Sequence, residues 1–361
     1  MVTTVKFAVI KVVQIVDTFS IWCKQKLSLS IKPAGFCLFA IALSLTFLTN
    51  ACKPWPNQAI KPLRVGITSW VGFDIALYAE PSGIFKQRGI EVELIRFENQ
   101  QDASRAVMRG ALDAAFVSLW DVMQVDPGNA TPLVLMTTNI SAGADGIVAK
   151  PKIKSVADLR DKKVGAKLGT VNHLILLEAL KAHQIKPSEV QVLDYSNDVS
   201  AQKIESGEID AAVLWQPMLG EIANKINGNT IYTTKQVDSL VIDILISNES
   251  ILEAKKAQIK QFMLAWFDVM DAVKTQPNKV FDTVGKKLGQ SGESVARDYA
   301  GLKPGDMSLN RRMFGADGRL NSAKTEIVQL LHSDPRHGRM IREDVKIDGT
   351  LVNEVMAGWK S

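Results

Sequence analysis

Cysteine is scarce in this chain of 361 residues, which contains only three. Because none follows Cys52, disulfide bonds and thiolate metal sites are excluded from the rest of the chain. The four histidines, at positions 173, 183, 332 and 337, do not have the spacing of a metal site. Walker loops, GxSxG elbows and HExxH motifs are also absent. The sequence therefore predicts no metal or cofactor, and it carries no catalytic motif.

An excess of charge of either sign is also missing from most of the chain. The formal net charge is +5, but residues 1–51 contribute most of it, with five lysines against one aspartate. The balanced remainder offers no electrostatic argument for nucleic-acid binding. A chain of this length with 46% hydrophobic residues can bury the core of one large domain or of two lobes.

A long hydrophobic run lies near the start of the chain. It spans 13 uncharged residues from Phe36 to Leu48, follows a lysine-bearing stretch and ends shortly before Ala51. This order is typical of an export signal, so we expect residues 1–51 to be a leader and the protein to be periplasmic or attached to the cell envelope. Residues 34–52 are 19 uncharged residues, so a retained membrane anchor is the alternative.

Cys52 directly follows Ala51 and resembles the lipid-modified first residue of a bacterial lipoprotein. The match is imperfect, because Thr49 stands where such sequences usually have leucine. We expect lipidation at Cys52, and an ordinary leader cysteine is the alternative. The prolines of the following PWPNQ segment predict an irregular tether.

Strand and helix patterns alternate from Leu63 onward. LRVGI (63–67), GIEVELI (89–95) and DAAFVSL (113–119) predict strands, and helical periodicity separates them. Such alternation favours an α/β fold with a largely parallel sheet between helices. After Asn248 the pattern becomes helical, and the expected capping residues near the helix starts are Ser250, Asn278 and either Ser291 or Glu293.

An internal repeat predicts two similar lobes. RGALDAAFVSLW (109–120) recurs as SGEIDAAVLWQP (206–217), with matching glycine, aspartate and alanines. Each copy predicts a helix, a glycine turn and a strand. A common helix-to-strand turn that recurs by chance is the alternative.

Two segments are candidates for crossings between the lobes. TTNISAGADGIVAK (137–150) and SLVIDILISN (239–248) each run between predicted strands. Two crossings are what a hinged clamp needs. The expected divisions are a leader (1–51), a tether (52–62), the first part of lobe 1 (63–139), lobe 2 (146–238), a helical return to lobe 1 (243–330) and a C-terminal tail (331–361).

Aromatic and small polar residues follow the predicted strands. Ligands of α/β sheets bind beyond the carboxyl ends of the strands, so we expect these residues to line a cleft between the lobes. Helix capping by Asp74 and Asp121, and core packing of Trp120 and Trp215, are the alternatives. The candidate ligand-binding residues are Ser69, Trp70, Gly72, Phe73, Asp74, Ser118, Trp120, Ser141, Asp145, Thr170, Asn172, His173, Trp215 and Gln216.

The segment AKLGTVNHLILLEAL (166–180) predicts a helix that begins near Thr170. The N–H groups and positive dipole end of such a helix favour an anionic group. His173, in the first turn, fits either a ligand contact or a structural role. The predicted loops nevertheless hold more acids than bases: Asp74, Asp121, Asp145 and Asp243 against Lys167 and His173. A bare oxyanion would lie near uncompensated carboxylates.

Four segments resemble the nitrate/sulfonate/taurine-type solute-binding proteins of ABC importers, a family shared with thiamin-pyrimidine-precursor binding proteins. They are SWVGFDIALYAEPSGIFKQRGIEVEL, GALDAAFVS, SAGADGIVAKPKIKSVADLRDKKVGAKLGTVNHLILLEAL and SGEIDAAVLWQPML, within about residues 63–270. The resemblance implies a type II periplasmic-binding-protein clamp, with a mixed sheet flanked by helices in each lobe and two hinge crossings. It also implies a monomer without enzymatic activity, which delivers a small solute to a membrane permease and its ATPase.

A zwitterion such as taurine fits the predicted loops, with its sulfonate at the helix start and its amine at an aspartate between aromatic rings. Nitrate and an amine-bearing heterocycle, such as a thiamin-precursor pyrimidine, are the alternatives. A pyrimidine-synthase-like enzyme has a related fold, but that family relies on a cysteine-rich motif that this chain lacks. A sensory binding module would need an attached signalling domain, for which no sequence pattern is present.

Overall fold

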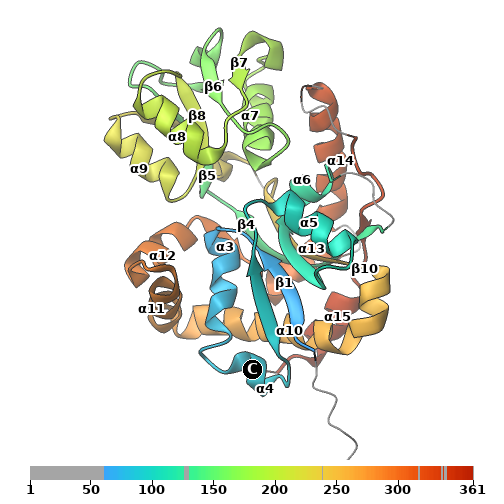
Figure 1. Cartoon of the computed structure of the whole chain (residues 1–361). Helices are drawn as coiled ribbons and strands as arrows, with labels where there is room; N and C mark the ends of the chain where they lie inside the picture. The colour runs from blue at the N-terminus through green and yellow to red at the C-terminus, as the bar shows by residue number, and fades with distance from the viewer. Residues whose placement is uncertain are drawn as a thin grey trace, which may run out of the picture. The chain divides into compact units, whose positions relative to one another are not determined.

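Two β-sheets, each flanked by helices, organise the chain from Leu63 onward (Figure 1). The computed structural model describes residues 61–125, 130–237, 239–315, 318–334, 336 and 340–360. The expected leader and Cys52 lie outside the described residues, so export and lipidation stay predictions. Within the described part of the chain, no helix combines the length and apolar character needed to cross a bilayer.

The first sheet and its helices, called lobe 1 below, contain seven strands in the order β11-β4-β10-β3-β1-β2, with β12 paired to β4. β1 pairs in parallel with β2 and β3, whereas β10 is antiparallel to β3 and β4. The strands are β1 (Leu63–Ile67), β2 (Val92–Arg96), β3 (Ala114–Ser118), β4 (Pro132–Ser141), β10 (Ile242–Asn248), β11 (Leu302–Pro304) and β12 (Lys346–Ile347).

The second sheet and its helices, called lobe 2, contain five strands in the order β7-β6-β8-β5-β9. β6 pairs in parallel with β7 and β8, and β5 is antiparallel to β8 and β9. The strands are β5 (Asp145–Ala149), β6 (Lys163–Gly165), β7 (Gln191–Leu193), β8 (Ala211–Trp215) and β9 (Asn229–Thr233).

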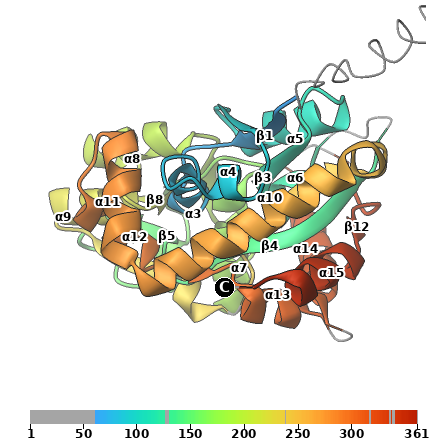
Figure 2. The same ribbon diagram turned by 90° about the horizontal axis from the view of Figure 1, so that it is seen from below.

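Helices cover both sheets, and α10 is the longest of those described (Figure 2). Lobe 2 contains η2 (Val156–Leu159), α7 (Val171–Ala182), η3 (Pro187–Glu189), α8 (Asn197–Glu205), α9 (Met218–Lys225) and η4 (Thr234–Gln236). The helices that follow β1, β2 and β3 are α3 (Val71–Asp74), η1 (Ile75–Tyr78), α4 (Ile84–Gln87), α5 (Gln100–Met108) and α6 (Leu119–Val122). Those after β10 are α10 (Glu249–Thr275), α11 (Pro277–Leu288), α12 (Gly292–Tyr299), α13 (Met307–Phe314), α14 (Arg319–Ser333) and α15 (Thr350–Gly358).

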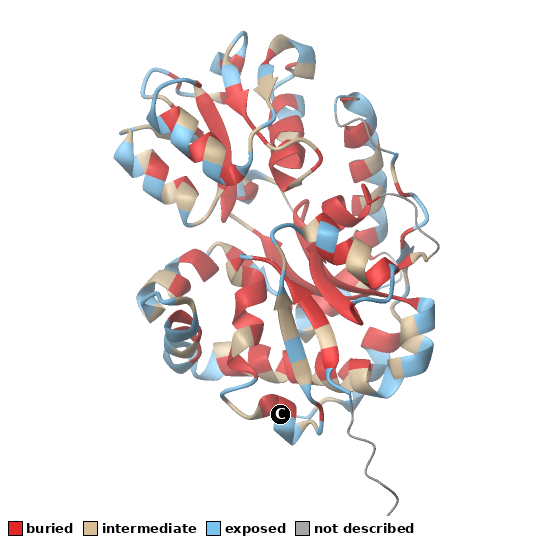
Figure 3. Ribbon diagram, viewed as in Figure 1, coloured by how far each residue is buried: buried red, intermediate tan, exposed pale blue. Residues whose placement is uncertain are grey.

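An aromatic cluster joins the first sheet to α10. The Phe116 ring lies 5.9 Å from that of Phe262 and 5.3 Å from that of Trp266, measured between ring centroids. All three side chains are buried, and the central strands β3, β4 and β10 of the first sheet and β5 of the second consist of buried residues (Figure 3). These aromatic side chains bury a large apolar area, and their tilted ring contacts further stabilise the core of lobe 1.

The internal repeat corresponds to the same structural unit in both lobes. Asp113 accepts a hydrogen bond from the backbone N–H of Arg64 at 2.8 Å, and Asp210 accepts one from that of Lys163 at 3.0 Å. Each aspartate thus ties the start of its strand to the parallel neighbour. The preceding glycine, Gly110 or Gly207, has a positive φ of 72° or 79°, a conformation that strongly favours glycine.

The chain passes from the first sheet to the second between β4 and β5, and it returns between β9 and β10. Both passages fall within or next to the segments expected to cross, residues 137–150 and 239–248. The strand orders β2-β1-β3-β10-β4 and β7-β6-β8-β5-β9 correspond position by position, with an antiparallel fourth strand in each. The expected two-lobed α/β fold with mixed sheets is confirmed.

The expected C-terminal tail contributes to the core of lobe 1. β12 extends the first sheet, and α15 packs on α10. Four side chains of α15 are buried in the same apolar cluster as the aromatic residues: Leu351, Val352, Val355 and Met356. A two-residue strand and a nine-residue helix carry too little sequence pattern to show this beforehand.

Replacement of Leu351 by alanine should therefore lower the free energy of unfolding by about 2 to 4 kcal/mol, because it opens a cavity under α15. Urea denaturation measures the change. Asn353→Ala, on the exposed side of the same helix, is the matched control and should shift stability by less than about 0.5 kcal/mol. Equal stabilities of the two variants would show that α15 is not part of the core.

Candidate functional site

A cleft with a volume of about 450 Å³ is lined by residues of both lobes. Lobe 1 contributes Ser69 and Trp70, which follow β1, and lobe 2 contributes Trp215, the last residue of β8, and Gln216, which follows it. The cleft therefore lies at the carboxyl ends of strands, where ligands of open α/β sheets bind.

Half of the fourteen candidate residues line this cleft: Ser69, Trp70, Asp74, Asp145, Thr170, Trp215 and Gln216. Trp70 is nearly buried, and its indole Nε1 donates a hydrogen bond of 2.6 Å to Oδ2 of Asp243. Trp215 is partly exposed and lies directly opposite Asp145 in the β5–β8 ladder. The structure thus brings aromatic rings and acids together, and their contacts with a ligand stay predictions.

The other candidates from lobe 1 do not line the cleft. Phe73 is buried and stacks on Phe116 with ring centroids 5.6 Å apart, so its ring belongs to the core. Ser118 caps α6, accepting a hydrogen bond from the backbone N–H of Asp121 at 2.9 Å. Ser141 shares a hydrogen bond of 2.7 Å with the Thr234 hydroxyl at the base of the lobes. These side chains therefore pack behind the residues that line the cleft and are not part of its lining.

Gly72 also lies behind the cleft surface, where it permits close packing. A Cβ at this position would lie 2.4 Å from Nδ2 of Asn139 and 2.7 Å from Nε1 of Trp70. Such distances are too short for any side chain, so glycine is needed for the Trp70 indole to reach Asp243.

The polar side chains at the start of α7 are hydrogen-bonded to backbone carbonyl groups. Asn172 donates a hydrogen bond of 2.6 Å to the carbonyl of Val213, and Thr170 donates one of 2.8 Å to the carbonyl of Lys167. Thr170 and Val171 nevertheless line the cleft, so α7 begins at its surface. Gln101 of lobe 1 donates a hydrogen bond of 2.7 Å to the Gly169 carbonyl and fixes this helix start from the opposite lobe.

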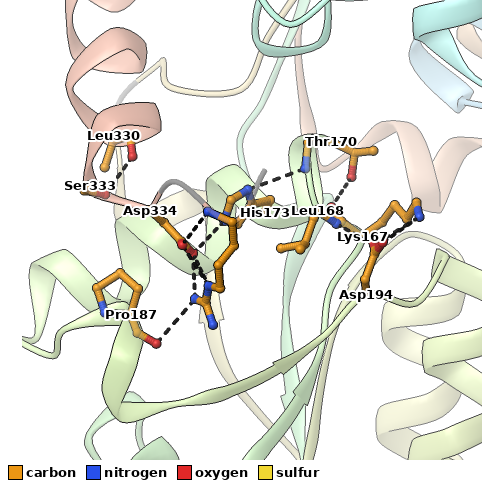
Figure 4. Close-up of polar contacts among 11 residues, drawn as sticks. Lys167, Leu168, Thr170, His173, Pro187, Asp194, Leu330, Ser333 and Asp334 are labelled. Atoms are coloured by element: carbon orange, nitrogen blue, oxygen red, sulfur yellow. Dashed lines mark hydrogen bonds and ion pairs between the residues drawn. The ribbon is translucent and has the colours of Figure 1, made fainter. Parts of the chain in front are cut away.

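His173 is a structural residue in this arrangement (Figure 4). It is fully buried, its Nε2 lies 3.2 Å from Oδ2 of Asp334, and its ring meets that of Trp120 edge-on with centroids 6.0 Å apart. Burial favours the neutral form of Asp334, but hydrogen bonds from His173 and Arg336 outweigh it and hold the pKa of this carboxyl well below its usual range. The network ties α7 to the segment after α14.

Two buried acids lie in the cleft immediately after the two crossings. Asp145 is the first residue of β5, and Asp243 is the second residue of β10. Burial raises the pKa of Asp145 to about 7. Burial also raises the pKa of Asp243 well above its usual range, and the charge of Asp145 adds to this shift. Two desolvated carboxylates thus oppose each other's ionisation.

Arg96 is a cleft residue that the sequence analysis missed. It follows the same rule as the others, since it ends β2, and it forms an ion pair of 2.8 Å with Asp74. Burial still raises the pKa of Asp74 to about 6 despite this arginine. Residues of α11 and α12, including Leu288 and Asp298, also line the cleft and had no strand-end signal. No cluster of three potential metal ligands occurs in the described part of the chain.

Residues 71–280, which include most of this cleft, match a protein family described as NMT1/THI5 like. The chain belongs to the NMT1/THI5-like family. A curated relative is the taurine-binding periplasmic protein of Escherichia coli (strain K12), 22% identical over 68% of this chain and 78% of that protein. The expected resemblance to solute-binding proteins of the sulfonate/taurine type is confirmed.

Solved structures share the fold of this family member. The periplasmic aliphatic sulphonate binding protein SsuA from Escherichia coli has a TM-score of 0.65 and 16% identity, over 80% of this chain and 98% of that protein. The desulfurization enzyme DszB has a TM-score of 0.55 and 15% identity, over 82% of this chain and 99% of that enzyme. At these identities the similarities establish the fold alone.

The raised pKa of Asp145 predicts a pH-dependent stability. Between its unfolded value of 3.8 and about 7, the folded protein binds a proton that the unfolded chain releases. The stability contributed by this bound proton should therefore fall as pH rises through this window, and Asp145→Asn should remove that contribution. The free energy of unfolding of the variant minus that of the wild type should be about 2 kcal/mol larger at pH 7.5 than at pH 5.5. Urea denaturation without ligand measures both values.

Asp198→Asn is the control for this measurement, because Asp198 lines the same cleft but is exposed. Its effect on stability should not change between the two pH values. A pH-independent effect of Asp145→Asn would show that Asp145 titrates as an ordinary exposed carboxyl.

Proposed function

We propose that the protein is the extracytoplasmic solute-binding component of an ABC importer, which captures a small solute in the cleft and delivers it to a membrane permease. The observation that carries this proposal is a cleft lined from both lobes, next to the two connections between them. Rotation about two such connections closes a clamp over its ligand. The protein acts as an exported monomer, anchored by a lipid at Cys52.

The chemistry of the cleft supports a small solute with both polar and apolar surface. Trp70, Trp215 and Pro217 offer apolar area, and the start of α7 offers the positive end of a helix dipole. The buried Asp145 and Asp243 disfavour a bare oxyanion such as nitrate. Taurine, whose sulfonate and ammonium suit the two ends of the cleft, fits better, as does an amine-bearing heterocycle. The names of the taurine- and sulphonate-binding proteins agree with this choice.

An enzymatic role is the weaker alternative. The DszB likeness concerns the fold alone. No cysteine follows Cys52, and the cleft holds no histidine among its described lining residues. Among the described lining residues, hydroxyl groups such as that of Ser69 have no histidine, cysteine or lysine beside them to complete a catalytic set. We therefore propose binding and release, without chemistry, as the function.

A thermal-shift screen with taurine, alkanesulfonates, nitrate and aminopyrimidines tests this function. A solute at 100 times its dissociation constant should add about 2.7 kcal/mol of stability.

Trp70→Ala should weaken binding of the solute by about 1 to 3 kcal/mol in isothermal titration, because the indole provides apolar contact and orients Asp243. Trp359→Ala is the control, since Trp359 hydrogen-bonds to Asp268 and does not line the cleft. Equal affinity of both variants would contradict the cleft assignment.

A further inference from the structure

The described lining of the cleft carries many more acids than bases. Arg96 is its only basic residue in that part of the chain, and the carboxylate of Asp74 already neutralises it. The acids of the lining are Asp74, Glu98, Asp121, Asp145, Asp198, Asp243 and Asp298. An unbalanced set of this kind attracts positive charge, yet a cluster of acids alone does not define a site.

Asp145 adds an independent observation. Its side chain is 3% exposed, and its Oδ2 accepts no hydrogen bond from the described residues, although the residue lines the cleft. Buried polar atoms are nearly always hydrogen-bonded, so a buried carboxylate oxygen without a donor calls for one from elsewhere. Asp145 lines the cleft, so a turn of its covered side chain toward the cleft brings this atom within reach of a donor there.

Asp243 and the two tryptophans complete the surroundings of this atom. The indole of Trp70 donates a hydrogen bond of 2.6 Å to Oδ2 of Asp243 and thereby fixes the position of that carboxylate. Asp145 and Asp243 are close enough for their charges to interact, and Asp121 adds to the same field. Trp215 faces Asp145 across the β5–β8 ladder, where directly opposed side chains lie on one side of the sheet.

We propose that Asp145 and Asp243 form a subsite for the protonated amine or amidine group of the solute, beside the rings of Trp70 and Trp215. This proposal rests on the proposed solute-binding function and narrows its ligand to organic cations and zwitterions. Ser141 already hydrogen-bonds to the Asp145 carboxyl, and a cationic N–H donor supplies the partner that Oδ2 of Asp145 lacks and separates two like charges. Indole faces favour the same charge. A metal ion is a poor occupant, because the described residues hold no group of three potential metal ligands.

Matched solutes that differ in one group test the subsite. Taurine and isethionate share a sulfonate and a two-carbon chain, but one ends in an ammonium and the other in a hydroxyl. The same comparison with 5-aminomethylpyrimidine and 5-hydroxymethylpyrimidine covers aromatic solutes. In isothermal titration at pH 8, the amine of at least one pair should bind the wild-type protein at least about 100-fold more tightly than its alcohol, because the alcohol leaves Asp145 without a charged donor.

Variants locate this preference. Asp145→Asn keeps the size of the side chain and should abolish the preference for the amine, and Asp243→Asn should reduce it. Glu253→Gln, at an exposed position of α10 outside the cleft, should leave it within about twofold, since exposed charges are screened. Circular dichroism establishes that each variant is folded. The solute comparison in the wild-type protein needs no variant, so the test holds even if one fails to fold.

The outcomes separate the two proposals. A solute without a positive group that binds as tightly as the best amine would overturn the subsite and leave the solute-binding function standing. An amine preference that persists in folded Asp145→Asn would also overturn the subsite. Failure of the pairs and of every solute in the screen to bind the wild-type protein would overturn the proposed function and the subsite with it.

Discussion

The burial of two like charges at the base of the cleft is the constraint on which the site depends. Asp145 and Asp243 stand on the strands that follow the two crossings, and burial raises the pKa of both. An apolar pair at these positions would avoid this desolvation. The fold instead keeps a covered carboxylate oxygen of Asp145 that has no hydrogen-bond donor among the described residues, next to a cleft that a solute can enter. Functional sites commonly lower the stability of the fold in this way, because groups that suit a ligand are unfavourable when the ligand is absent.

The scaffold makes this arrangement possible because it repeats one unit. In each lobe a glycine turn leads into an aspartate that holds the neighbouring parallel strand, as Asp113 and Asp210 do. The carboxyl ends of the strands therefore meet at the cleft from both lobes. Contacts such as that of Gln101 with the Gly169 carbonyl, and of His173 with Asp334, fix the start of α7 beside it. The position of the start of α7 beside the cleft thus depends on residues that are far apart in the sequence.

Sequence patterns predicted the lobes, and half of the candidate site residues line the cleft. The repeat and the two crossings have short-range signatures: Trp70 follows a strand end, and Asp145 lies in the first crossing segment, at the start of β5. The same rule cannot separate a ring that faces the cleft from one that faces the core, so Phe73 and Trp120 were included although both are packed inside. Asp298 comes from a helix whose position depends on long-range packing, which no local pattern reveals. Of the two caps expected for α12, Ser291 is the one used, whereas α10 is capped by Asn248 rather than Ser250, and α11 begins after Gln276 rather than at Asn278.

A crystal structure of the protein with the tightest-binding solute from the screen tests the central claim most directly. The account predicts that a nitrogen of the solute lies about 3 Å from Oδ2 of Asp145, with the solute in contact with Trp70 and Trp215. A solute bound outside the cleft, or one whose anionic or uncharged end faces Asp145 and Asp243, would contradict it.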